Sequence, residues 1–253
     1  MAKEVDGSEV YLGSGKVYFA ERVNDVLTGE DFLGDISTLE ITPAISEIEK
    51  KSSATAARPV IASDVTDYSL TVRMTGGQFN KGNLARAFGG EIGSLVNGSG
   101  SVVDEAIANV EQGKYYPLTK RNVGTVVVTS DPAGTTYDVT DDYEVDAATG
   151  RIYIVPGGAI ADGSEILVDF AYSAETKVTV KAGLKARSYG FLRFIGNNTR
   201  GKKFELQIWK LGLSSTGAVG FIQDQYGEFT LEGKIEADLS GHAAEPYFRL
   251  IEL

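Results

Sequence analysis

The chain has 253 residues, enough for one large β domain or two smaller ones, and carries 35 acidic against 24 basic side chains, a formal net charge of −11. This charge argues against a sequence-independent grip on nucleic acid, because such binding needs basic groups that displace counterions from phosphates. The absence of cysteine excludes disulfides, thiolate nucleophiles and thiolate metal sites. Without a signal peptide or an apolar run of about 20 residues, we expect a soluble protein that is made in the cytoplasm.

The first part of the chain predicts strands around a long polar segment. A polar leader, residues 1–14, should be mobile, and a first strand follows at 15–20. Residues 39–41 and 68–74 alternate apolar and polar side chains, as strands of a half-buried sheet do. The segment between them, 47–67, is too polar for a core element, so we expect a long charged loop that is poorly ordered in the free monomer.

This loop is our first candidate contact surface. It is either an arm that becomes ordered on a neighbouring molecule or a surface loop without a role. The charged residues proposed to make the contact are Glu47, Glu49, Lys50, Lys51, Arg58 and Asp64.

A short helix and a second group of strands come next. Residues 80–90 predict the helix, with Asn80 or Asn83 as its cap and Gly89 and Gly90 at its end. Residues 96–101 indicate a flexible Gly/Ser connection. Closely spaced strands with turn residues between them then predict a small inserted β-sandwich at 115–176, which leaves 1–114 and 177–253 as one discontinuous domain.

The remaining chain returns to alternating strands, ending at 246–251. Between the strands at 189–195 and 204–211 lies a hairpin loop with three cations, Arg200, Lys202 and Lys203. We expect these cations to meet an acidic neighbour.

Candidate chemistry is sparse. His242 is the one histidine, and nothing at ligand spacing surrounds it. Asp142, Glu144 and Asp146 share one face of a predicted strand, where a solvated acidic face is favoured over a weak cation site. No phosphate loop, dinucleotide motif or activated serine is present, so we expect no catalytic residue, cofactor or metal, and no enzyme.

The order of these elements resembles the major tail (tail tube) proteins of long-tailed, siphovirus-type bacteriophages. The resemblance covers about residues 15–95 and 176–253, with the middle as an insertion. It rests on 39–43 leading into 47–52, on 68–72 and 83–90, and on 227–238 with 246–248.

This resemblance implies an all-β sandwich or barrel with one flanking short helix. It also implies a structural virion protein that closes in hexameric rings and stacks into the tube through which the genome reaches the host. Its partners would be itself and the tail tip and tail terminator proteins, with no membrane contact. DNA would pass through a predominantly acidic channel without specific binding.

Two other readings stay open: a β-sandwich adhesion or carbohydrate-binding module, and an antiparallel β enzyme.

Overall fold

A computed structural model describes residues 10–253, and their regular structure is all β-strand apart from one short helix. The expected all-β class with one helix is therefore confirmed. The chain divides into two compact units, and each is described by itself. Unit 1 consists of two segments of the chain, the residues up to Ile92 and the residues Val180–Leu253. Unit 2 is the segment between them, Gly93–Thr179.

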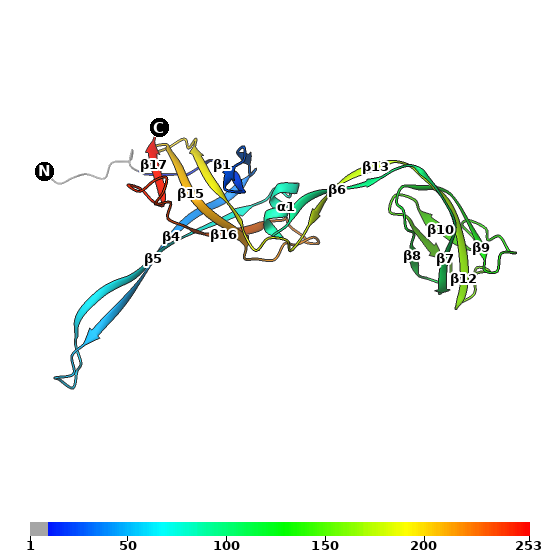
Figure 1. Ribbon diagram of the computed structural model, residues 1–253, viewed down its shortest axis with the longest axis horizontal. Helices are drawn as coiled ribbons and strands as arrows, with labels where there is room; N and C mark the ends of the chain where they lie inside the picture. Colours follow the sequence, from blue (N-terminus) through cyan, green and yellow to red (C-terminus); the bar gives the residue numbers. More distant parts are fainter. Residues whose placement is uncertain (1–9) are drawn as a thin grey trace. The chain divides into compact units, whose positions relative to one another are not determined.

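Unit 1 is built on a nine-stranded antiparallel sheet in the order β2-β1-β14-β15-β16-β5-β4, with β3 beside β1 and β17 beside β15 (Figure 1). Its elements are β1 (Gly15–Val23), β2 (Val26–Leu27), β3 (Asp31–Phe32), β4 (Ile36–Lys51), β5 (Val60–Gly76), α1 (Lys81–Ala87), β14 (Ser188–Gly196), β15 (Phe204–Ser215), β16 (Phe229–Ile235) and β17 (Phe248–Glu252). A separate pair, β6 (Glu91–Asn97) with β13 (Glu175–Lys181), forms a two-stranded sheet.

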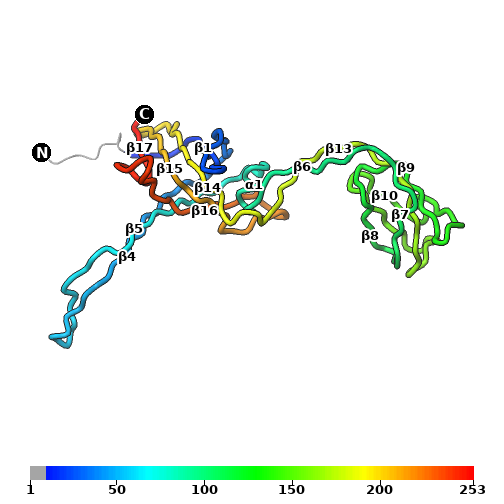
Figure 2. Tube along the Cα trace, viewed as in Figure 1, coloured from blue at the N-terminus to red at the C-terminus, as the bar shows by residue number. Residues whose placement is uncertain are grey.

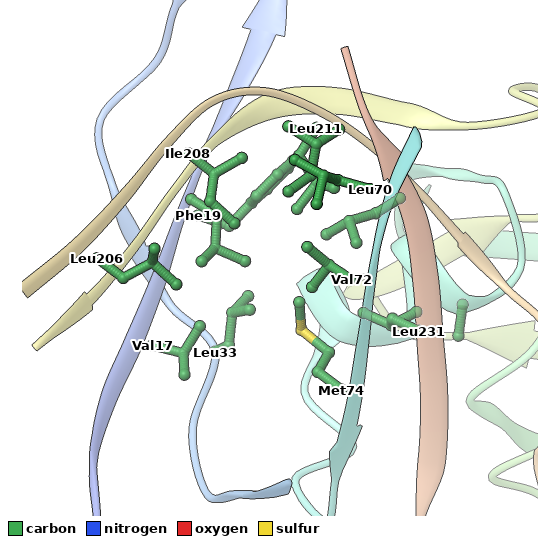
Figure 3. Close-up of a cluster of buried hydrophobic side chains, with 14 of the residues drawn as sticks. Val17, Phe19, Leu33, Leu70, Val72, Met74, Leu206, Ile208, Leu211 and Leu231 are labelled. Carbon is green, nitrogen blue, oxygen red and sulfur yellow. The ribbon is translucent and has the colours of Figure 1, made fainter. Parts of the chain in front are cut away.

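The core of unit 1 lies between the two halves of this sheet. Val17, Phe19 and Ile208 come from the half that holds β1 and β15, and Val72 and Leu231 come from the half that holds β5 and β16. Figure 3 shows the two sets pointing toward each other across the interior. The sheet therefore folds over on itself like a sandwich, and the alternation of its strands decides which side chains are buried.

The helix α1 is fixed to this body by polar contacts. Asn80 caps it, because its side-chain oxygen accepts the backbone N–H of Asn83 at 2.8 Å. The Nδ2 atom of buried Asn83 donates to the carbonyls of Leu33 (2.7 Å) and Gln78 (2.9 Å). The sequence predicted both this helix and Asn80 as one of two possible caps.

Unit 2 is a small sandwich of two three-stranded sheets, β10-β11-β8 and β7-β12-β9. The strands are β7 (Gly100–Val110), β8 (Tyr115–Pro117), β9 (Val123–Ser130), β10 (Tyr143–Asp146), β11 (Arg151–Ile154) and β12 (Ser164–Tyr172). Both sheets contribute to one core, with Ile152 and Ile154 from the first and Val128, Ile166 and Val168 from the second.

The boundaries predicted for the insertion, 115 and 176, are wrong. The structure places them at Gly93 and Thr179, because β7 pairs along β12 from Gly100 to Val110. The Gly/Ser run at 96–101 is likewise not a free connection, since it contributes the end of β6 and the start of β7.

Candidate assembly surface

The outer half of the β4–β5 hairpin, residues 42–68, extends beyond the rest of unit 1. β5 pairs with β16 only from Leu70 to Gly76, whereas β4 and β5 pair with each other as far as Lys51 and Val60. Figures 1 and 2 show the two strands running on together past the rest of unit 1. Every residue from 42 to 51 and from 53 to 68 is exposed.

The expectation of a poorly ordered loop at 47–67 is therefore wrong. Residues 47–51 and 60–67 are strand, and only 52–59 form the turn. The backbone N–H and C=O groups of this polar segment form hydrogen bonds across the hairpin. The polar composition of the segment does not indicate this pairing. In the turn, Ser52 N–H donates to Pro59 O at 2.8 Å and Arg58 N–H to Thr55 O at 3.1 Å.

The outer half also carries apolar side chains that stay in water. Ile45, Ile48, Ile61 and Val65 are each about 60% exposed, and Tyr68 is less so, with its ring edge-on to Tyr247. Ile45 and Tyr68 are cross-strand partners. Exposed apolar side chains grouped on a projecting element are typical of an interaction surface.

The sequence-predicted charges all lie on this hairpin. Glu47 accepts a 2.6 Å hydrogen bond from Ser63, and Glu49 lies 3.8 Å from the Nζ of Lys51. Asp64 is the cross-strand partner of Ile48. The end of the hairpin, residues 49–60, has one acidic side chain, Glu49, and three basic ones, Lys50, Lys51 and Arg58, so its net charge is positive.

The second predicted surface, Arg200, Lys202 and Lys203, is a structured loop. The Nδ2 of buried Asn198 donates to the carbonyls of Arg200, Gly201 and Lys202. Lys202 forms a 3.1 Å ion pair with Glu252 of its own chain. One of the three cations therefore already has an acidic partner inside unit 1, and contact of this loop with a neighbouring molecule stays a prediction.

The described part of the predicted leader lies against this loop. Leu12 forms a β-bridge with Arg200, and the Tyr11 and Phe204 rings lie 6.0 Å apart. The rest of the leader that was predicted to be mobile, residues 1–9, lies outside the described part of the chain.

The one histidine lies in a cluster that the sequence did not predict. The His242 ring stacks on Trp209 with centroids 3.6 Å apart, and its Nδ1 is 2.8 Å from Asp238 Oδ2. His242 together with Lys210 holds the pKa of Asp238 well below its usual range. This arrangement ties the segment before β17 to β15, a structural role.

Two members of the acidic triplet, Asp142 and Asp146, stabilise turns, and Glu144 is exposed. Asp142 is nearly buried, and its carboxylate accepts the backbone N–H groups of Ala159 (2.6 Å) and Asp138 (2.9 Å), which lowers its pKa. Asp146 binds Thr149 and Arg151, which lower its pKa to about 2. Within residues 10–253 no group of three or more ligating side chains could hold a metal ion.

A further surface, which sequence reasoning missed, is the β15–β16 loop, residues 216–228. Phe221 stacks on Phe88 of the helix end, with centroids 6.1 Å apart and an angle of 8°. Beyond this anchor, Ile222 and Tyr226 are 99% and 101% exposed, and the charges of the loop are Asp224 and Glu228. The sequence feature that marks this surface is the presence of Ile222 and Tyr226 in a polar stretch bounded by glycines. Their exposure, however, is visible only in the structure.

No helix in the described residues is long and apolar enough to cross a membrane. A search of curated proteins finds no match. The model of one family, described as "Protein of unknown function UCP028589", matches residues 10–250, which include the helix and every strand described above except the last two residues of β17. The chain therefore belongs to the UCP028589 family.

Proposed function

We propose that this protein is a structural subunit that assembles with copies of itself into the tail tube of a long-tailed bacteriophage. The observation that carries the proposal is the outer β4–β5 hairpin, whose strands pair with each other as far as Lys51 and Val60 and expose apolar side chains. The ribbon buries almost none of its own side chains, so such a length of it is best explained by a contact that it makes.

The geometry supports contacts of the head-to-tail kind. The hairpin leaves the sheet at one end only, and we propose that it contacts a different surface of the second copy. Contacts between unlike surfaces build rings when they close and filaments when they do not. A tube of stacked rings uses both.

The proposed role is non-enzymatic, and the protein is a virion component. The resemblance adds hexameric rings, tail tip and tail terminator proteins as partners, and DNA that passes through the channel without specific binding. The net charge of −11 supports an acidic channel wall, because fixed cations would hold a passing polyanion.

Replacing part of the hairpin tests the proposal. Ser46 and Asp67 are cross-strand partners, so Asn-Gly in place of residues 47–66 should close a two-residue turn in register. We expect a folded protein with a β-rich circular dichroism spectrum that stays monomeric, while the wild type forms rings or tubes in negative stain. Wild-type protein that sediments only as a monomer at high concentration and several salt levels contradicts the proposal.

One observation favours a second role for unit 2, as a binding module. Tyr115 and Tyr153 are cross-strand partners with ring centroids 4.8 Å apart, on the face of β8 and β11 turned away from the core. Aromatic rings with neighbouring polar groups suit sugar recognition. Binding of the wild type, but not of Tyr115→Ala, to a glycan array would support this second role.

A further inference from the structure

We propose that the basic end of the hairpin in one copy docks on the β15–β16 loop of the next copy. This rests on the proposed function, since it names the surface that receives the hairpin. We call residues 49–60 the hairpin tip and keep the name β15–β16 loop for 216–228.

The two surfaces lie at opposite ends of one ladder. β5 and β16 pair from Leu70 with Ile235 at one end to Gly76 with Phe229 at the other. The hairpin continues beyond Leu70, and the β15–β16 loop enters at Phe229. Figure 1 shows the hairpin and the start of β16 on opposite sides of unit 1. The two surfaces of one copy therefore cannot meet each other, but those of successive copies can.

The β15–β16 loop presents apolar groups that unit 1 leaves uncovered. Phe221 is held against Phe88, and a side chain at Gly227 would collide with the Phe79 ring, so the loop lies close to the body at both points. Ile222 and Tyr226 have no protein contact that removes them from water. Burying two such side chains favours association, against the cost of ordering them.

The hairpin tip matches the loop in both polarity and charge. Beside the turn it exposes Val60, with Ile48 and Ile61 immediately adjoining. Its net charge is positive, because three basic side chains, Lys50, Lys51 and Arg58, outnumber the acidic Glu49. The net charge of the β15–β16 loop is negative, because it contains Asp224 and Glu228 and no basic residue. An apolar basic surface and an apolar acidic one are complementary, which directs the contact as well as stabilising it.

Cross-linking tests this contact directly, because the chain has no cysteine of its own. A disulfide requires Cβ atoms about 3.5–4.5 Å apart, so it forms only between residues that meet. We expect the full chain carrying Ala54→Cys and Gln225→Cys to give a ladder of covalent oligomers on oxidation, which collapses to monomer on reduction. The control variant combines Ala54→Cys with Thr28→Cys. Thr28 lies at the same end of the sheet as the hairpin, so this variant should give no ladder.

Charge reversal gives a second measurement. Lys50→Glu with Lys51→Glu, or Asp224→Lys with Glu228→Lys, should raise the concentration needed for assembly about tenfold, since two attractions become repulsions worth about 1.4 kcal/mol. All four substitutions together should restore assembly, while circular dichroism shows every variant folded.

The outcomes separate this inference from the proposed function. Two results overturn the docking contact and leave the proposed function standing. In the first, the wild type forms tubes or rings but the variant with Ala54→Cys and Gln225→Cys gives no cross-linked ladder. In the second, the variant with all four charge reversals does not regain the assembly that each pair of reversals loses. Wild-type protein that never assembles overturns both.

Discussion

At the scale of single residues, Asn83 joins three parts of unit 1. Its side chain is buried and donates to the carbonyls of Leu33 and Gln78 while its backbone completes the Asn80 cap. We expect Asn83→Ala to lower the free energy of unfolding by about 2–3 kcal/mol, because two carbonyls lose their donor in a dry site. Urea denaturation measures this change.

Lys81→Ala is the matched control on the same helix, because Lys81 is exposed. It should change the free energy of unfolding by less than about 0.5 kcal/mol. Equal losses for the two variants would show that the Asn83 side chain does no more than any other helix residue.

Asp146 makes stability of unit 2 dependent on acid. Its pKa is lowered to about 2 by Thr149 and Arg151, from the ordinary aspartate value of 3.8. A lowered folded-state pKa means that the stabilisation is present above pH 4 and is lost as the pH falls toward 2. Asp146→Asn should therefore lower the melting temperature at pH 7, with the difference from wild type closing by pH 2.

Glu144→Gln on the same strand, where the side chain is exposed, is the control and should leave the melting temperature at pH 7 unchanged. A difference between wild type and Asp146→Asn that stays constant from pH 7 to pH 2 would contradict the assignment.

At the scale of elements, alternation predicted the strands that bury one face. Leu70, Val72 and Met74 of β5 are all in the core, as their spacing indicated, and the Asn and Gly residues that bound α1 marked its ends. These predictions succeeded because burial and capping leave a local pattern in the sequence.

The outer hairpin and β7 were missed for one shared reason. Neither buries a continuous apolar face, since 42–51 is wholly exposed and β7 buries only Val110 fully. Their strands are held by backbone pairing, across a turn in the hairpin and to the distant β12 in the case of β7, and backbone pairing leaves little pattern in the side chains. The charged residues of the candidate site could thus be predicted by type, whereas their place on a hairpin could not.

At the scale of the whole molecule, the corrected boundaries change which excision should succeed. Removing Gly93–Thr179 with a short Gly/Ser bridge takes out both sheets of unit 2 together. Removing only 115–176 leaves β7 without its partner β12 and exposes its apolar side chains. We expect the first protein to be soluble, folded and able to assemble, and the second to aggregate.

Size-exclusion chromatography and negative stain of the two excised proteins measure this difference. If the 93–179 deletion fails to fold, unit 2 contributes to the stability of unit 1. A well-behaved 115–176 deletion would favour the boundaries expected from the sequence.

The pairing inside the outer hairpin also bears on how fast copies associate. Its backbone is already ordered in the monomer, because β4 and β5 bond to each other without help from a neighbour. Fixing a backbone costs about 1–2 kcal/mol per residue, and here folding has met that cost before any encounter. Association then needs no folding step, so its rate should rise in proportion to the concentration of free ends and fall with added salt, as for two rigid, oppositely charged bodies.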